Sequence, residues 1–294
     1  YDALYQTAGD LTHVLTRDER HAAYMADAYA RVTGRVGVCE GPSGGGATYI
    51  SPGVVEANES SIPILAITTD ISVSGRGRYT LTELDQEAMF RPLAKFTQVI
   101  DNAVDLPRTL RRAFKEMTTG RPGAAHIGLP FDVQRQTVDE NDIWAEQEYG
   151  RYPARRTGPD PDAIEAAADL IGKAKQPLLI CGGGVVISSA ELELEALAKK
   201  IDAPIATTIS GQGSITDDHL LSLGVVGSNG GTNATRMVVD AADLVIFVGC
   251  RAGSVTTERW CHPAPGKVKI VHIDVDPAVM GASYRPDVGI VGDA

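Results

Sequence analysis

Glu19 lies within an expected helix, where its carboxylic group could serve either acid–base chemistry or helix capping. A carboxylic group in a poorly solvated pocket can share a proton with a bound ligand, because burial tunes its protonation state. The spacing Thr16-x-x-Glu19 also fits a capping box, in which Glu19 would bond the Thr16 backbone N–H. Spacing alone favours this second, structural role.

Two glycine-rich loops stand between an expected strand and an expected helix, where backbone N–H groups and the helix dipole favour an anion. The loop at residues 41–48 is not a Walker A loop, because Ala47 occupies the position of the phosphate-binding Lys. The loop at residues 181–186 lacks the G-x-G-x-x-G spacing of a standard NAD site. Spacing alone favours a tight turn for each loop.

Short apolar runs alternate with amphipathic stretches along the chain, which predicts parallel βαβ units. The expected strands are residues 36–40, 64–68, 123–128, 177–181, 204–208, 244–248 and 268–273. The expected helices are residues 16–31, 47–60, 106–118, 162–174, 189–201 and 233–241. A charged, proline-containing stretch interrupts this alternation and predicts an interdomain linker. We therefore expect an α/β protein with two tandem doubly wound parallel-sheet domains, residues 1–140 and 161–294, joined by a linker at residues 141–160.

Composition excludes several classes of function. The 294 residues are 43% hydrophobic, enough for two cores, and the formal charge of -11 argues against nucleic acid and anionic membranes as partners. No apolar run approaches the ~20 residues that span a bilayer, and no signal pattern opens the sequence, so we expect a cytoplasmic protein. The four cysteines are scattered and indicate neither a metal site nor disulfides.

An ordered series of short segments covers nearly the whole sequence. In the first half it comprises residues 18–20, 22–31, 33–34, 43–48, 61–63, 83–86, 90–92, 120–123 and 129–134. In the second half it comprises residues 182–185, 217–219, 223–224, 242–244, 249–251 and 272–277. Each segment is weak alone, but the series resembles the thiamine-diphosphate enzyme family, in the branch of acetolactate synthase, glyoxylate carboligase and benzoylformate decarboxylase.

The resemblance implies a catalytic role for Glu19 in place of the capping role. In the family the matching glutamate bonds the N1′ nitrogen of the cofactor's aminopyrimidine ring, which favours the imino tautomer that removes the thiazolium C2 proton. The residues expected to bind thiamine diphosphate are Glu19, Gly44, Gly45, Gly46 and Thr82. Those expected to form an FAD- or ADP-type site in the central domain are Gly182, Gly183, Gly184, Gly249, Arg251 and Asp274.

The resemblance also implies a three-domain enzyme of which this chain carries the first two domains. The family's third domain, with its Gly-Asp-Gly and Asn-Asn motif for the diphosphate and Mg²⁺, has no counterpart here. We therefore expect a fragment that is inactive alone, from a homodimer or homotetramer with its active site at a dimer interface. Within residues 1–294 we expect no metal ligand.

Three departures from the family pattern leave the substrate open. Thr82 stands where many relatives have a glutamine whose amide faces the reacting centre. The family's Ser-Gly-Pro-Gly-Ala-Thr-Asn becomes Ser-Gly-Gly-Gly-Ala-Thr-Tyr at residues 43–49, and Arg251 is followed by Ala-Gly-Ser-Val-Thr rather than Phe-Asp-Asp-Arg.

Several other polar residues receive structural interpretations. Lys95 lies beside apolar neighbours and is expected to extend its ammonium group to the surface. Arg76 and Arg78 could bind a carboxylate, but a solvated loop is the favoured interpretation. His21, His126 and His272 are expected at core or edge positions.

The resulting functional hypothesis is a thiamine-diphosphate-dependent carboligase or decarboxylase, a lyase or transferase acting on a 2-oxo acid or aldehyde. The alternative is a non-catalytic nucleotide-binding or assembly module that pairs with a separate cofactor-holding subunit. An NAD-dependent oxidoreductase is disfavoured by the glycine spacing.

Overall fold

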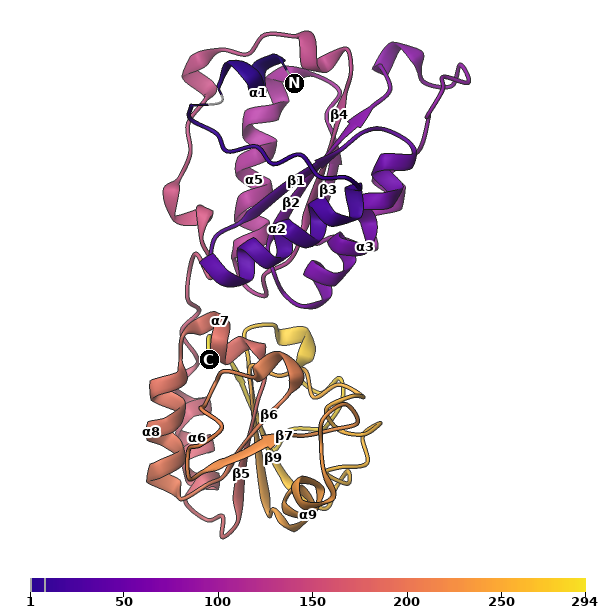
Figure 1. Ribbon diagram of the computed structural model, residues 1–294. Helices are drawn as coiled ribbons and strands as arrows, with labels where there is room; N and C mark the ends of the chain where they lie inside the picture. Colours follow the sequence, from indigo (N-terminus) through magenta and orange to yellow (C-terminus); the bar gives the residue numbers. More distant parts are fainter. Residues whose placement is uncertain (1, 8) are drawn as a thin grey trace. The chain divides into compact units, whose positions relative to one another are not determined.

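The structure, a computed structural model, describes residues 2–7 and 9–294. Tyr1, where the first expected domain begins, and Ala8 lie outside the described residues. The chain forms two compact units, Tyr1–Ala154 and Arg155–Ala294. Each unit contains one parallel sheet with helices on both faces, so the expected fold class is confirmed (Figure 1).

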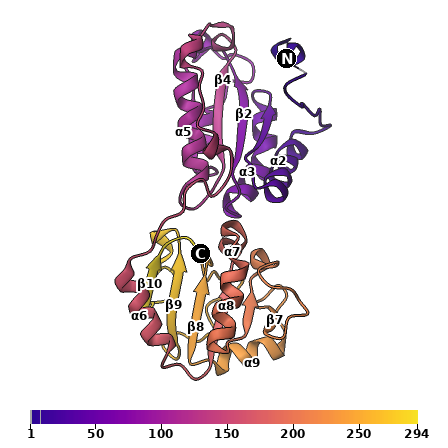
Figure 2. The ribbon, with the colours of Figure 1, turned by 90° about the vertical axis from the view of Figure 1, so that its left-hand side faces the viewer.

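The first unit is built on a four-stranded sheet of order β1-β2-β4-β3. Its strands are β1 (Gly37–Gly41), β2 (Ile64–Asp70), β3 (Phe96–Val99) and β4 (Ala125–Pro130). Its helices are α1 (Asp2–Gln6), α2 (Glu19–Thr33), α3 (Gly45–Glu59), α4 (Gln86–Phe90) and α5 (Leu106–Thr118). In Figure 2, α2 and α3 cover one face of the sheet and α5 covers the other. Successive strand residues alternate between the faces, since Ile64 packs with α2 and α3 while Leu65 packs with α5.

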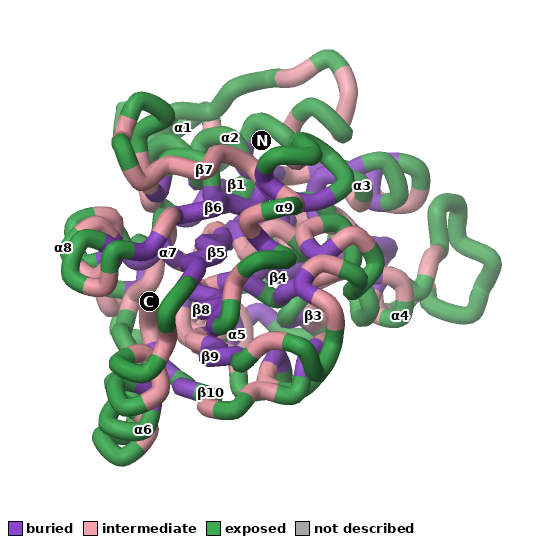
Figure 3. The backbone as a smooth tube through the Cα atoms, turned by 90° about the horizontal axis from the view of Figure 1, so that it is seen from below, coloured by how far each residue is buried: buried purple, intermediate pink, exposed green. Residues whose placement is uncertain are grey.

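The second unit is built on a six-stranded sheet of order β10-β9-β8-β5-β6-β7. Its strands are β5 (Pro177–Cys181), β6 (Ile205–Thr207), β7 (Ser222–Val225), β8 (Leu244–Val248), β9 (Lys269–Asp274) and β10 (Val288–Val291). Its helices are α6 (Pro161–Ile171), α7 (Gly183–Ser188), α8 (Glu191–Ile201) and α9 (Asn233–Ala241). Leu179 packs on the face that α6 and α8 cover, and Leu178 packs on the face that α9 covers. Strands β5 and β8 are buried along their length, whereas the helices expose residues to solvent (Figure 3).

The order of the strands determines where ligands can bind in the second unit. The chain moves from β5 to β6 and β7 on one side, and then returns to β8, β9 and β10 on the other. The strand order therefore reverses between β5 and β8, and in open α/β sheets ligands bind beyond the carboxyl ends of the strands at such a switch point. The described residues contain no helix with both the length and the apolar character to cross a membrane.

Candidate cofactor-binding site

Glu19 is the first residue of α2, and Asp18 rather than Thr16 caps that helix. Asp18 is extended, with φ −157° and ψ 138°, and its carboxylate accepts a hydrogen bond from the Arg20 N–H at 2.9 Å. The Thr16 hydroxyl instead donates to the Asp18 carbonyl at 3.0 Å. The capping box that spacing favoured for Thr16 and Glu19 is therefore wrong, because the helix begins three residues after Thr16.

The Glu19 carboxylate lies beside the first turn of α3. A Cβ placed on Gly46 would come within 3.3 Å of Glu19 Oε1 and 2.3 Å of Pro42 Cγ, so a side chain there would fill the space next to the carboxylate. Glu19 is half-buried, and its side chain makes no hydrogen bond to any other described residue. The carboxylate is therefore partly withdrawn from water and available to a ligand.

Thr82 contacts the same loop although it is 39 residues away in sequence. Its hydroxyl lies 2.9 Å from the Ser43 hydroxyl. A Cβ on Gly44, whose φ is +63°, would lie 2.7 Å from the Thr82 Cβ, whereas a Cβ on Gly45 would meet no heavy atom within 4 Å. The structure thus brings Glu19, Thr82 and the three glycines together at the carboxyl end of β1.

This arrangement fits the pyrimidine part of thiamine diphosphate. Glu19 offers a carboxylic group without an internal partner among the described residues. Because Gly44 and Gly46 have no side chains, the loop lies close to Thr82 and Glu19. The space beside these two residues therefore stays open for a ligand. The N–H groups of the first turn of a helix have no partner within the helix, so the start of α3 also offers donors to a ligand.

The other polar residues considered from the sequence either have structural contacts or are exposed or buried without a role in this site. Arg76 pairs with Asp101 at 2.7 Å and lies 3.7 Å from Asp70, whereas Arg78 is exposed. The Lys95 ammonium donates to the Thr119 and Arg121 carbonyls at 2.7 and 2.9 Å. Among the histidines, His126 and His272 are buried, and His21 is exposed on α2.

Buried cysteines do not add a nucleophile to either unit. Burial raises the pKa of the Cys39 and Cys250 thiols to about 12, and it raises the pKa of Cys181 as well. These thiols are protonated at neutral pH and therefore unreactive. Within the described ranges, no three His, Cys, Asp or Glu side chains gather in a group that could hold a metal ion.

In the second unit, the predicted residues lie at the carboxyl ends of β5, β8 and β9. Gly182, Gly183 and Gly184 follow β5, Gly249 and Arg251 follow β8, and Asp274 ends β9. Arg251 is exposed and its carbonyl accepts from the Ser283 hydroxyl at 3.3 Å, while the buried Asp274 accepts from the Asp276 N–H at 2.9 Å. The residues after β5 and the residues after β8 flank the switch point of the sheet, where a ligand is expected.

The glycines after β5 and β8 are also required by packing. A Cβ on Gly182 would lie 2.1 Å from the Gly249 carbonyl oxygen, and one on Gly184 would lie 2.6 Å from the Gly249 Cα. These contacts are with backbone atoms, which cannot move aside as a flexible side chain can. The two loops therefore pass each other at a separation that only glycine allows.

Gly182→Ala is expected to destabilise the protein by about 1–3 kcal/mol, the usual cost of forcing extra atoms into a packed region. Thermal unfolding measures the change. Gly253→Ala is the matched control, because a Cβ at Gly253 meets no atom within 4 Å. Equal melting temperatures for the two variants would contradict the packing argument.

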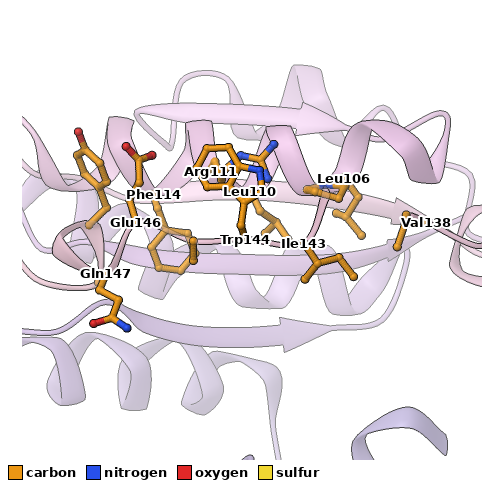
Figure 4. A pocket seen from close by; sticks show the side chains of 13 residues that line it. Leu106, Leu110, Arg111, Phe114, Val138, Ile143, Trp144, Glu146 and Gln147 are labelled. Atoms are coloured by element: carbon orange, nitrogen blue, oxygen red, sulfur yellow. The ribbon is translucent and has the colours of Figure 1, made fainter. Parts of the chain in front are cut away.

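A separate apolar pocket lies between α5 and residues 138–150 of the same unit. Its cavity of about 580 Å³ is lined by Leu106, Leu110 and Phe114 on one side and by Val138, Ile143 and Trp144 on the other (Figure 4). The Arg111 guanidinium lies 4.0 Å from the centre of the Trp144 ring, and its Nη1 donates to the Asp142 carbonyl at 2.8 Å. The pocket contains none of the predicted site residues and carries no part of the function proposed below.

Comparisons with known proteins give a family match for each of the two units. Residues 1–89 match the family model described as "Thiamine pyrophosphate enzyme, N-terminal TPP binding domain", and residues 164–294 match "Thiamine pyrophosphate enzyme, central domain". A probable acetolactate synthase large subunit of Methanocaldococcus jannaschii is 41% identical over 296 residues, covering 100% of this chain and 49% of that protein. An acetolactate synthase of Arthrospira platensis is 37% identical over 304 residues, covering 100% of this chain and 51% of that protein. The chain thus spans about half the length of the curated relatives it matches.

Proposed function

Because this chain belongs to the thiamine pyrophosphate enzyme family, of which it contains the N-terminal and central domains, we propose that it forms part of a carboligase or decarboxylase of the acetolactate synthase type. The substrate would be a 2-oxo acid or an aldehyde. The observation that carries the proposal is the Glu19 carboxylate, half-buried beside the glycine loop and without a hydrogen-bond partner among the described residues.

Glu19 would hold a proton at the N1′ nitrogen of the aminopyrimidine ring. Thiamine diphosphate, when bound, supplies a nucleophilic carbon for attack on the substrate carbonyl. Partial burial of Glu19 limits its exposure to water, and the adjacent glycines leave room for a ring. Thr82 would contribute a hydroxyl oxygen, whose proton is donated to the Leu81 carbonyl, where many relatives offer a longer amide.

We propose that the diphosphate and Mg²⁺ bind to protein outside residues 1–294, and that the active site is completed in a homodimer or homotetramer. Both proposals rest on the family resemblance. In the second unit we propose at most weak binding of an adenine nucleotide such as FAD or ADP at the β5–β8 switch point. Weak binding is expected because the two glycine loops contact each other there and the residues after Arg251 depart from the flavin-binding pattern.

The proposal predicts turnover of a 2-oxo acid by the full-length enzyme that carries this chain, with thiamine diphosphate and Mg²⁺ added. Residues 1–294 alone are expected to show none, because they lack the diphosphate site that the family resemblance places elsewhere. Release of CO₂ and formation of a new carbon–carbon bond are the measurements. A full-length protein that binds thiamine diphosphate without any turnover would favour the non-catalytic module, and turnover by residues 1–294 alone would contradict the placement of the diphosphate site.

A further inference from the structure

A chain of hydrogen bonds crosses the interior of the first unit and links three strands to α4. The Thr97 hydroxyl on β3 lies 2.9 Å from Nδ1 of His126 on β4. His126 Nε2 lies 2.7 Å from the hydroxyl of Thr68 on β2, which in turn bonds the Gln86 side-chain oxygen at the start of α4. Thr68 and His126 are fully buried and Gln86 is 1% exposed, so water cannot substitute for a lost partner.

Only one assignment of donors and acceptors is consistent with all of these hydrogen bonds. Gln86 Oε1 can only accept, so the Thr68 hydroxyl donates its single proton to it. His126 Nε2 must then donate to Thr68, which leaves Nδ1 as the acceptor for the Thr97 hydroxyl. Burial lowers the pKa of His126 to about 3, so the ring is neutral at physiological pH, as this arrangement requires.

The series of hydrogen bonds ends at Gln86, on the same segment of the protein as Thr82. Gln86 Nε2 donates to the Thr69 carbonyl at 2.8 Å and to Asp70 Oδ1 at 3.2 Å, which ties the beginning of α4 to the end of β2. At the other end of α4, the Phe90 ring stacks on His126 with centroids 3.7 Å apart. Thr82 lies four residues before Gln86, so the position of α4 limits where Thr82 can reach the Ser43 loop.

We infer that Thr68, His126 and Gln86 are positioning residues of the active site, which hold α4 against the sheet and thereby hold Thr82 against the loop of Ser43 and Gly44. None of the three touches that loop in the described contacts; they act through α4. The inference deepens the proposed function and rests on it for the effect on the reaction.

Thr68→Val tests the inference by removing the central hydroxyl without changing the size of the side chain. Thr118→Val is the matched control, because Thr118 is also fully buried in this unit and its hydroxyl bonds the Phe114 carbonyl at 2.7 Å and no other described residue. Thr68→Ser keeps the hydroxyl and is expected to behave as wild type. Gln86→Met is the second test variant, used if Thr68→Val does not fold.

Two measurements on the full-length enzyme separate the inference from the proposed function. Trypsin cleavage at the exposed Arg78 reports how firmly the loop before α4 is held and needs no activity. We expect Thr68→Val to raise the cleavage rate and to lower kcat, each by about 10-fold, because loss of the hydroxyl leaves the buried Gln86 oxygen and His126 Nε2 without their partner. The KM for the 2-oxo acid should change less than kcat, and Thr118→Val should alter neither measurement at a similar melting temperature.

Equal cleavage of Thr68→Val and Thr118→Val would overturn the positioning role. Faster cleavage of Thr68→Val with unchanged kcat would overturn its link to the reaction. A wild-type enzyme without turnover would refute the proposed function. The cleavage rates would still decide whether the hydrogen bonds of Thr68, His126 and Gln86 hold the loop before α4.

Discussion

Glu19→Gln is expected to lower turnover of the full-length enzyme by about 10²–10⁴-fold, the usual loss for a general acid–base group. An amide has the shape of the carboxylic group but cannot supply an acidic proton to N1′. The fold should not suffer, because Asp18 caps α2 and Glu19 bonds no other described residue. We expect a change in unfolding free energy within about 0.5 kcal/mol.

Exchange of the C2 proton of bound thiamine diphosphate, followed by NMR, measures the step that Glu19 should assist. Calorimetry on the same samples gives cofactor affinity, and thermal unfolding gives stability. Glu56→Gln is the control, because Glu56 lies near the far end of α3 in an exposed ion pair with Arg31 at 3.3 Å. Wild-type exchange in a folded Glu19→Gln enzyme would remove Glu19 from the mechanism.

Gly44→Ala is expected to reduce both stability and turnover. Gly44 has φ +63° and ψ −112°, a conformation that residues with a Cβ rarely adopt, so an alanine there costs about 1–3 kcal/mol in backbone strain. The new Cβ would also lie 2.7 Å from the Thr82 Cβ, so Thr82 or the loop must move. We expect a loss of about 2–6 kcal/mol in unfolding free energy from the two effects together, and a fall in kcat of at least about 10-fold.

Gly34→Ala measures the cost of a positive φ without a collision, in the left-handed helical region, which residues with a Cβ adopt more readily than the conformation of Gly44. Gly34 ends α2 with φ +65°, and a Cβ there meets no atom within 4 Å. Its substitution should therefore cost the strain alone, about 1–2 kcal/mol. Thr82→Gly removes the colliding Cβ, so Gly44→Ala should cost less in that background, which a double-mutant cycle of unfolding free energies measures. Equal costs for Gly44→Ala and Gly34→Ala would show that Thr82 does not press on the loop.

The elements that the sequence predicted best are those with a strong local pattern. Residues 106–118, 177–181, 233–241 and 244–248 form α5, β5, α9 and β8 with the predicted bounds. Strands β3, β7 and β10 were not predicted, because each has only four residues and is formed by pairing with a strand from elsewhere in the chain. The helix predicted at residues 189–201 forms as α8, which begins two residues later, at Glu191. The short helix α7 before it was not predicted.

The start of α2 shows why the chemistry of Glu19 could not be decided from spacing. Thr16 and Asp18 are both residue types that cap helices well, and either one places a glutamate in the first turn. The choice depends on backbone angles, since the extended conformation of Asp18 lets its carboxylate reach the Arg20 N–H. The sequence selected Glu19 through an ordered family pattern, and the fold removed the competing structural role.

The sequence by itself determined the alternation of strands and helices, the family, and the residue types at the candidate site, because these are properties of local pattern and order. The tertiary structure decided which of these residues meet. Ser43 contacts Thr82 across 39 positions, and Thr68 bonds His126 across 58. The glycines after β5 were interpreted as a tight turn, but only folding brings the Gly249 carbonyl to a distance that excludes any side chain at Gly182. Such contacts depend on how strands order themselves in a sheet, which no local run of residues specifies.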